Sequence, residues 1–198
     1  MIPVYIVQQI TLQQHGELHD SLDQRWNDFL LKADILPVLL PNNPDLVDEM
    51  LRCNLAEAAI FTGGGEYHNS KSDTRSEVER IIMRWSEIHG YPLVGVCRGM
   101  QSMMLYKGSK LKLCEGQVSN TQNITFFGER ICVNSFHNFE CTAINAEFDI
   151  VGTSDDGVVK AVTGKVLPWF GLMWHPERLC PHRVEDYNLF KKYVSRRI

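Results

Sequence analysis

Residues 92–100 read PLVGVCRGM, and this stretch decides the fold that the sequence predicts. The run Pro92–Val96 is apolar throughout, which is typical of a β-strand covered on both faces. The residues after Cys97 place Met100, Met103 and Met104 at the spacing of a helix with an apolar side. The chain therefore turns from a buried strand directly into a helix at Cys97.

Two glycines, Gly95 and Gly99, flank this turn and carry no Cβ that could collide across it. A side chain at the end of a buried parallel strand is held out from the carboxyl edge of the sheet, where α/β proteins form their sites. The amino end of the following helix favours the thiolate form of Cys97, which is the form that attacks electrophiles. A buried structural cysteine is the alternative, and the context of strand and helix favours a nucleophile.

The first half of the chain alternates short apolar runs with amphipathic stretches, and this alternation predicts a parallel sheet layered with helices. A capping box at Thr74–Glu77 predicts the start of one helix, and Gly90 its end. The predicted strands are 4–7, 35–40, 58–61 and 92–96, and the predicted helices contain residues 22–30, 44–51, 78–88 and 100–104.

The second half changes to short strands separated by turns, which we expect to be partly antiparallel. They are predicted at 111–113, 124–127, 131–133, 148–151, 158–162 and 170–173, before a last helix with Tyr187, Phe190 and Val194. We therefore predict one α/β domain over residues 1–198. It has a mostly parallel central sheet and a smaller, partly antiparallel β region in the second half.

Composition narrows the classes of partner. The 198 residues carry 20 basic and 24 acidic side chains, interspersed along the chain, so nucleic acid and membrane surfaces are not expected partners. Residues 1–8 do not resemble a signal peptide, so a cytoplasmic protein is expected. The six cysteines form no CxxC pair, so we expect reduced thiols, no metal site and no cofactor.

A base for the cysteine is predicted in the segment Met173–Glu177, which reads MWHPE. His175 follows a predicted strand, and Glu177, two residues later, can fix the tautomer of its imidazole. His137 is a second candidate in the sequence. The other histidines lie in polar or helix-end settings where solvation is expected: His15, His19, His68, His89 and His182.

Two backbone segments can supply amides for an oxyanion. One is the N–H of Arg98, directly after the nucleophile, and the other is the glycine run in Thr62–Gly65 after a predicted strand. A flexible turn is the alternative for the glycine run. The side chains of Arg25, Asp73 and Arg75 either line the far side of the pocket or act as a cap or surface charges.

These motifs together resemble the class I glutamine amidotransferase-like hydrolases with their Cys-His-Glu triad. The resemblance rests on Gly95–Gln101 and Trp174–Glu177 and extends over nearly the whole chain in matching order. It implies a flavodoxin-like three-layer sandwich, a glutamyl thioester intermediate and a small γ-glutamyl substrate. Cys97 is then the nucleophile, His175 the general base and acid, and Glu177 the orienting residue.

The same resemblance implies roles in binding. Gly64 is the second oxyanion amide, with Gly65 as the alternative, and Gln101 holds the amino acid end of the substrate. The residues Asn134, Ser135 and His137 resemble the Asn-Ser-x-His signature of the γ-glutamyl hydrolases, which implies contacts with the glutamyl α-amino and α-carboxyl groups; a polar turn is the alternative. Gln117 and Gln122 depart from the family, which often has histidines in this segment.

A narrower resemblance is to the short hydrolases of capsule phosphoramidate synthesis. It rests on residues 22–26, 114–116 and 134–138 together with Met173–His175 followed by Glu177-Arg178. It implies release of glutamate from a γ-glutamyl nucleoside diphosphoramidate. The alternatives are a glutaminase subunit that supplies ammonia to a synthetase, a γ-glutamyl-GABA type hydrolase, and a binding protein on the same scaffold. The sequence does not show whether the protein forms a homodimer or binds a synthetase partner.

Overall fold

Five parallel strands form one half of the central sheet in the computed structural model, which describes residues 1–65 and 73–195. Their spatial order is β4-β1-β5-β6-β13. All four neighbouring pairs are parallel. The first four strands confirm the prediction for the first half of the chain, and β13 adds a parallel strand from the second half. The strands are β4 (Ile35–Leu40), β1 (Ile2–Val7), β5 (Ala59–Phe61), β6 (Leu93–Val96) and β13 (Trp169–Leu172).

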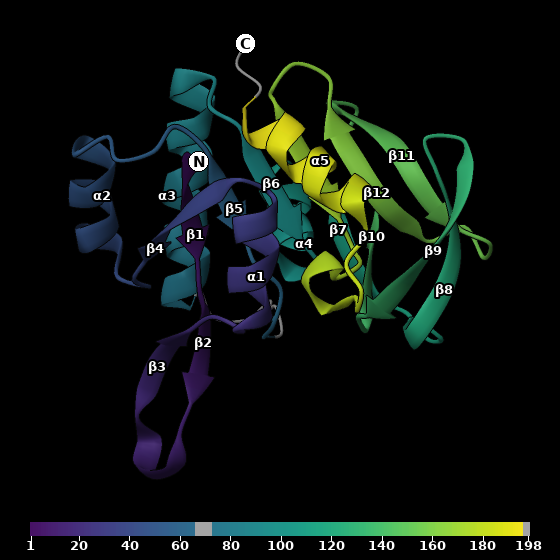
Figure 1. Cartoon of the computed structure of the whole chain (residues 1–198), viewed down its shortest axis with the longest axis horizontal. Coiled ribbons are helices and arrows are strands. Elements are labelled where there is room, and N and C mark those ends of the chain that lie inside the picture. The colour runs from purple at the N-terminus through teal and green to yellow at the C-terminus, as the bar shows by residue number, and fades with distance from the viewer. Residues whose placement is uncertain (66–72, 196–198) are drawn as a thin grey trace.

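Four antiparallel strands continue the same sheet beyond β13, in the order β12-β11-β8-β9 (Figure 1). The predicted antiparallel region is thus an extension of the parallel sheet. Its strands are β12 (Val159–Gly164), β11 (Phe148–Ser154), β8 (Val118–Phe126) and β9 (Glu129–Phe136).

Two ribbons lie outside the main sheet. One pairs β7 (Lys110–Leu113) with β10 (Phe139–Thr142), and the other is a hairpin of β2 (Gln9–Leu12) and β3 (Leu18–Ser21). The hairpin extends away from the rest of the molecule (Figure 1). Neither β10 nor the hairpin was predicted.

Helices cover both faces of the sheet and complete the three predicted layers. The core between one face and its helices contains Trp26, Phe29 and Phe190, from α1 (Arg25–Lys32) and α5 (Val184–Val194). The opposite core contains side chains of α2 (Pro44–Arg52), α3 (Thr74–His89) and α4 (Arg98–Tyr106). This arrangement confirms the flavodoxin-like α/β fold. No helix in the described parts of the chain is both long and apolar enough to cross a membrane.

The start of α3 differs from the predicted capping box. Asp73, and not Thr74, is the N-cap, since its side chain accepts a hydrogen bond from the Ser76 N–H at 2.7 Å. Both residue types can cap a helix, and the aspartate one position earlier takes the role. The predicted end is confirmed, because Gly90 closes α3 in the left-handed conformation at φ 66°.

The turn at Cys97 depends on the close contact that its two glycines permit. A Cβ on Gly99 would lie 2.4 Å from the carbonyl oxygen of Phe61, and a Cβ on Gly95 would lie 2.6 Å from the backbone of Gly99. The first turn of α4 therefore rests directly on the backbone at the end of β5. This confirms the steric reason for glycine on both sides of the cysteine.

We predict that Gly99→Ala lowers the free energy of unfolding by about 1–3 kcal/mol, as overpacking of a tight contact does. The new methyl group meets backbone atoms of Phe61, which cannot rotate away as a side chain could. Thr74→Ala, at an exposed helical position, is the control and should change the stability by less than about 0.5 kcal/mol. Urea titrations of both variants test this, and equal stability of Gly99→Ala and wild type would contradict it.

Candidate active site

Cys97 occupies the strained corner between β6 and α4. Its backbone has φ 52° and ψ −107°, a conformation that few residues other than glycine adopt. Its N–H donates to the Leu172 carbonyl at 2.7 Å, and its Sγ lies 3.8 Å from the Phe136 carbonyl oxygen. Strain of this kind costs about 1–3 kcal/mol and is found mostly at functional sites.

His175 and Glu177 form a buried pair directly after β13. The distance between His175 Nδ1 and Glu177 Oε1 is 2.7 Å, and both residues are 1% exposed. With Nδ1 bound to the carboxylate, Nε2 is left for a second partner, and His175 and Cys97 line the same cavity. The structure thus pairs His175 with Glu177 beside the cavity that Cys97 also lines.

The charge of His175 follows from these two partners. Burial lowers the pKa of its imidazole, but the hydrogen bonds with Cys97 and Glu177 outweigh burial and raise the pKa to about 9. The ring is therefore protonated at neutral pH. A protonated imidazole beside a cysteine stabilises the thiolate and holds a proton for transfer.

Asn134 holds the backbone of His175. Its Oδ1 accepts from the His175 N–H at 2.7 Å, and its Nδ2 donates to the His175 carbonyl at 2.8 Å. Ser135 also points behind the site, where its hydroxyl donates to the Gln117 carbonyl at 2.7 Å. Neither Asn134 nor Ser135 is among the residues that line the cavity at Cys97.

His137 lines that cavity, but hydrogen bonds occupy both of its ring nitrogens. Nδ1 lies 2.9 Å from the Phe139 carbonyl, and Nε2 lies 2.7 Å from Lys160 Nζ. Burial and the ammonium of Lys160 lower the pKa of His137 to about 4, so its ring is neutral. Since Nε2 accepts from Lys160, the ring proton is on Nδ1 and donates to Phe139.

Lys160 is the buried centre of a polar network that sequence reasoning missed. It is 1% exposed and donates to Gln117 Oε1 at 2.6 Å and to Ser135 Oγ at 3.0 Å. Burial lowers the pKa of Lys160 to about 8. Gln122 joins the network by donating to Gln117 Oε1 at 2.9 Å. The only signal in the sequence was one lysine inside the apolar run Val158–Val162.

The cavity at Cys97 has a volume of about 310 Å³, which is suited to a compact ligand. Gln101 lies on its wall and donates to the Phe139 carbonyl at 3.0 Å. The lining residues are Gly64, Gly65, Cys97, Arg98, Gln101, Phe136, His137, Asn138, Phe139, His175 and Arg178. A larger groove of about 780 Å³ between α2 and α3 contains none of the predicted site residues.

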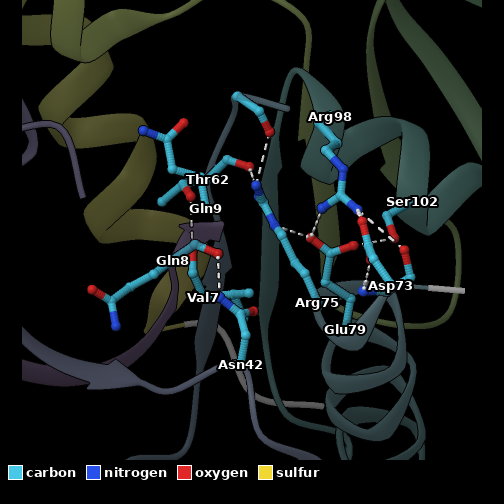
Figure 2. Close-up of polar contacts among 12 residues, drawn as sticks. Val7, Gln8, Gln9, Asn42, Thr62, Asp73, Arg75, Glu79, Arg98 and Ser102 are labelled. Carbon is cyan, nitrogen blue, oxygen red and sulfur yellow. Dashed lines mark hydrogen bonds and ion pairs between the residues drawn. The ribbon is translucent and has the colours of Figure 1, made fainter. Parts of the chain in front are cut away.

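The glycine segment 63–65 lies against the histidine. A Cβ on Gly63 would lie 2.3 Å from His175 Cε1, so only glycine leaves room for the ring. Thr62 anchors the start of the segment, because its hydroxyl donates to the Val7 carbonyl at 2.7 Å (Figure 2). Gly64 and Gly65 reach the cavity wall from this anchored position.

The remaining polar candidates lie away from the cavity wall. Arg75 is buried behind the glycine segment, Asp73 caps α3, and Arg25 pairs with Asp23 at the surface. His15, His19 and His89 are exposed, and His182 is half-buried. His68 lies outside the described residues. The cysteines are free thiols, and no group of three or more His, Cys, Asp or Glu side chains in residues 1–65 and 73–195 could hold a metal ion.

Comparison with known proteins places the chain in a family. Residues 17–194 match the family model of the class I glutamine amidotransferases, so the chain belongs to that family.

One relative is the γ-glutamyl-CDP-amidate hydrolase of Campylobacter jejuni, which is 30% identical over 146 residues and covers 72% of each chain. The glutamine-hydrolysing GMP synthase of Francisella tularensis subsp. novicida is 27% identical over 76% of this chain, which spans only 29% of that enzyme. A Thermoplasma acidophilum structure, provisionally named as part of a GMP synthase, superposes with a TM-score of 0.73 at 19% identity. The match covers 98% of this chain and 93% of that one.

We predict that NMR titration of the His175 imidazole gives a pKa near 9, and that Glu177→Gln lowers this pKa by about 1–3 units, as loss of an adjacent opposite charge does. Because the pKa in the folded state is above the ordinary value of 6.5, the imidazolium stabilises the fold fully below pH 6.5. This stabilisation is lost as the pH rises through 9. Glu185→Gln, on the exposed side of α5, is the control, and a wild-type pKa below 6.5 would refute the assignment.

Proposed function

We propose that the protein is a cysteine-dependent hydrolase that cleaves a γ-glutamyl amide bond through a glutamyl thioester. The observation that carries the proposal is that Cys97 and His175 line one cavity, with His175 Nδ1 fixed 2.7 Å from Glu177 Oε1. Membership of the class I glutamine amidotransferase family supports the same chemistry.

The reaction begins when the Cys97 thiolate attacks the γ-carbonyl carbon. As the carbon–nitrogen bond breaks, the His175 imidazolium gives its proton to the leaving nitrogen, and the amine departs. Water then attacks the thioester and gives a proton to His175, which releases glutamate and restores the thiolate. The N–H of Arg98 and an N–H of Gly64 or Gly65 bind the oxyanion in both steps.

The glutamyl end of the substrate lies against Gln101 and His137 on the cavity wall. Asn134 contributes by fixing the backbone of His175, and Ser135 contributes through Lys160, which holds His137. The Asn-Ser-x-His segment thus supports substrate binding mainly from behind the wall.

The leaving group we favour is a nucleoside diphosphoramidate. The 30% identity with the γ-glutamyl-CDP-amidate hydrolase supports this choice, and so does Arg178 at the cavity. The Arg178 guanidinium lies 5.5 Å from the centre of the Phe136 ring, and its Nε lies 3.4 Å from Glu177 Oε1. Most of its donors are left for phosphate oxygens, which a guanidinium binds in pairs.

A glutaminase subunit that supplies ammonia to a synthetase is the second candidate. The similarity to a GMP synthase favours it. This chain spans only 29% of that enzyme, so it matches one part of a larger synthetase. The chemistry at Cys97 is the same in both cases, so the substrate distinguishes them.

Cys97→Ala should abolish release of glutamate from γ-glutamyl nucleoside diphosphoramidates and from glutamine, because no thioester can form. Intact-protein mass spectrometry of the wild type during turnover should show one glutamyl adduct, on Cys97. Cys53→Ser, which changes an exposed thiol, is the control and should keep wild-type turnover. Turnover of Cys97→Ala at the wild-type rate would eliminate the mechanism.

Arg178→Gln separates the two candidate functions. For the phosphoramidate substrate we expect kcat/KM to fall about 10- to 100-fold, the effect of losing a charge-assisted hydrogen bond, with glutamine hydrolysis within threefold. Arg183→Gln, on the next arginine along the chain, is the control. Efficient wild-type hydrolysis of glutamine alone, with no turnover of the phosphoramidate, would favour the glutaminase instead.

A further inference from the structure

A buried cluster of charges connects the two backbone segments that carry the oxyanion amides. Glu79 of α3 accepts on Oε1 from Arg75 Nε and from Arg98 Nη1, each at 2.9 Å (Figure 2). Its Oε2 accepts from the Ser102 hydroxyl at 2.7 Å. Glu79 has no exposed surface, and the two arginines are each 2% exposed. One carboxylate therefore ties α3 to the first turn of α4.

The Arg75 side chain extends from this carboxylate to the glycine segment. Its Nη1 donates to the Gly64 carbonyl at 2.8 Å and lies 3.4 Å from the Gly63 carbonyl, and its Nη2 donates to the Thr62 carbonyl. Figure 2 shows the Arg75 guanidinium between Glu79 and Thr62. A single side chain thus binds three successive peptide groups.

Binding a carbonyl also sets the direction of the next amide. In a planar trans peptide the N–H points opposite to the C=O, so the Gly65 N–H points away from Arg75 when the Gly64 carbonyl points toward it. Arg75 does not line the cavity, whereas Gly64 and Gly65 do. The bond at 2.8 Å fixes the peptide between Gly64 and Gly65 more closely than the contact at 3.4 Å fixes the peptide before it.

The other arm of the cluster fixes the residue after the nucleophile. Besides Glu79, the Arg98 guanidinium contacts Asp73 Oδ2 at 3.3 Å and donates to the Ser76 hydroxyl at 3.1 Å. The Arg98 side chain is thereby held at the start of α3, while its backbone begins α4 beside Cys97. The positions of both proposed amide donors, the N–H groups of Arg98 and Gly65, therefore depend on the Glu79 carboxylate.

We propose that Arg75 and Glu79 are positioning residues that set the spacing of the oxyanion hole, with Gly65 as its second amide. This inference rests on the proposed hydrolase function. It requires that the cluster affect formation of the tetrahedral intermediate, with little effect on substrate binding or on the thiolate of Cys97.

The test uses Arg75→Lys, Arg75→Gln and Glu79→Gln, with Arg80→Gln on the exposed side of α3 as the matched control. Lysine keeps the charge but cannot bind several carbonyl groups in the fixed geometry of a guanidinium, so this variant should fold and still lose rate. We expect kcat to fall about 10- to 100-fold in the cluster variants, with KM within threefold of wild type. Arg80→Gln should match the wild type.

Alkylation of Cys97 by iodoacetamide is the second measurement, because it needs the thiolate but no oxyanion hole. Rates within twofold of wild type, with reduced kcat, are the expected result. Unchanged kcat in Arg75→Lys and Glu79→Gln would overturn the inference, and so would a parallel loss of alkylation and turnover, which indicates a disturbed nucleophile. A wild-type protein that hydrolyses no γ-glutamyl compound would instead refute the proposed function.

Discussion

The structure depends on a contact between backbones, that of Gly99 with the end of β5. A Cβ at position 99 would lie 2.4 Å from the Phe61 carbonyl oxygen, so α4 approaches the sheet more closely than any residue with a side chain would allow. This closeness lets Cys97 leave β6 and enter α4 with no intervening loop, at φ 52°. The thiol is thereby fixed by two rigid elements and not by a flexible segment. His175 and the glycine segment line the same cavity as this fixed thiol.

Charges that lie behind the cavity hold its wall together. On one side, Glu79 joins the arginines of α3 and α4, and on the other, Lys160 binds His137 and Ser135. Removing one member of such a buried pair leaves an uncompensated charge, which is why these clusters resist rearrangement. The cavity wall therefore combines backbone groups, Gln101 and the neutral ring of His137 with the charged side chains of His175 and Arg178, while Glu79 and Lys160 are buried behind it. A wall built in this way is rigid before the substrate arrives, which reduces the cost of ordering it during the reaction.

The sequence predicted what depends on local order along the chain. The apolar run and the glycines beside Cys97 are neighbours in the sequence, and so are His175 and Glu177; the structure has the strand, the turn and the 2.7 Å contact of His175 with Glu177 at these positions. The hairpin of β2 and β3 was not predicted, because neither strand has a buried face to produce an alternating pattern. The contacts of Asn134 with His175 and of Lys160 with His137 span 41 and 23 positions. Such pairings depend on which way side chains point from neighbouring strands, and a one-residue change in register would reverse them.

The bare backbone at Gly63 has a consequence for the evolution and engineering of this protein. The imidazole of His175 occupies the volume that a methyl group at this position would fill. Its backbone is clamped by Asn134 and its Nδ1 by Glu177, so the ring has no alternative place to rest. An alanine at position 63 would displace the His175 ring, the proposed proton donor, because the three heavy atoms nearest to its methyl group all belong to that ring. For the proposed hydrolase, one added methyl group at position 63 would remove turnover and leave a protein that binds its ligand and releases it unchanged.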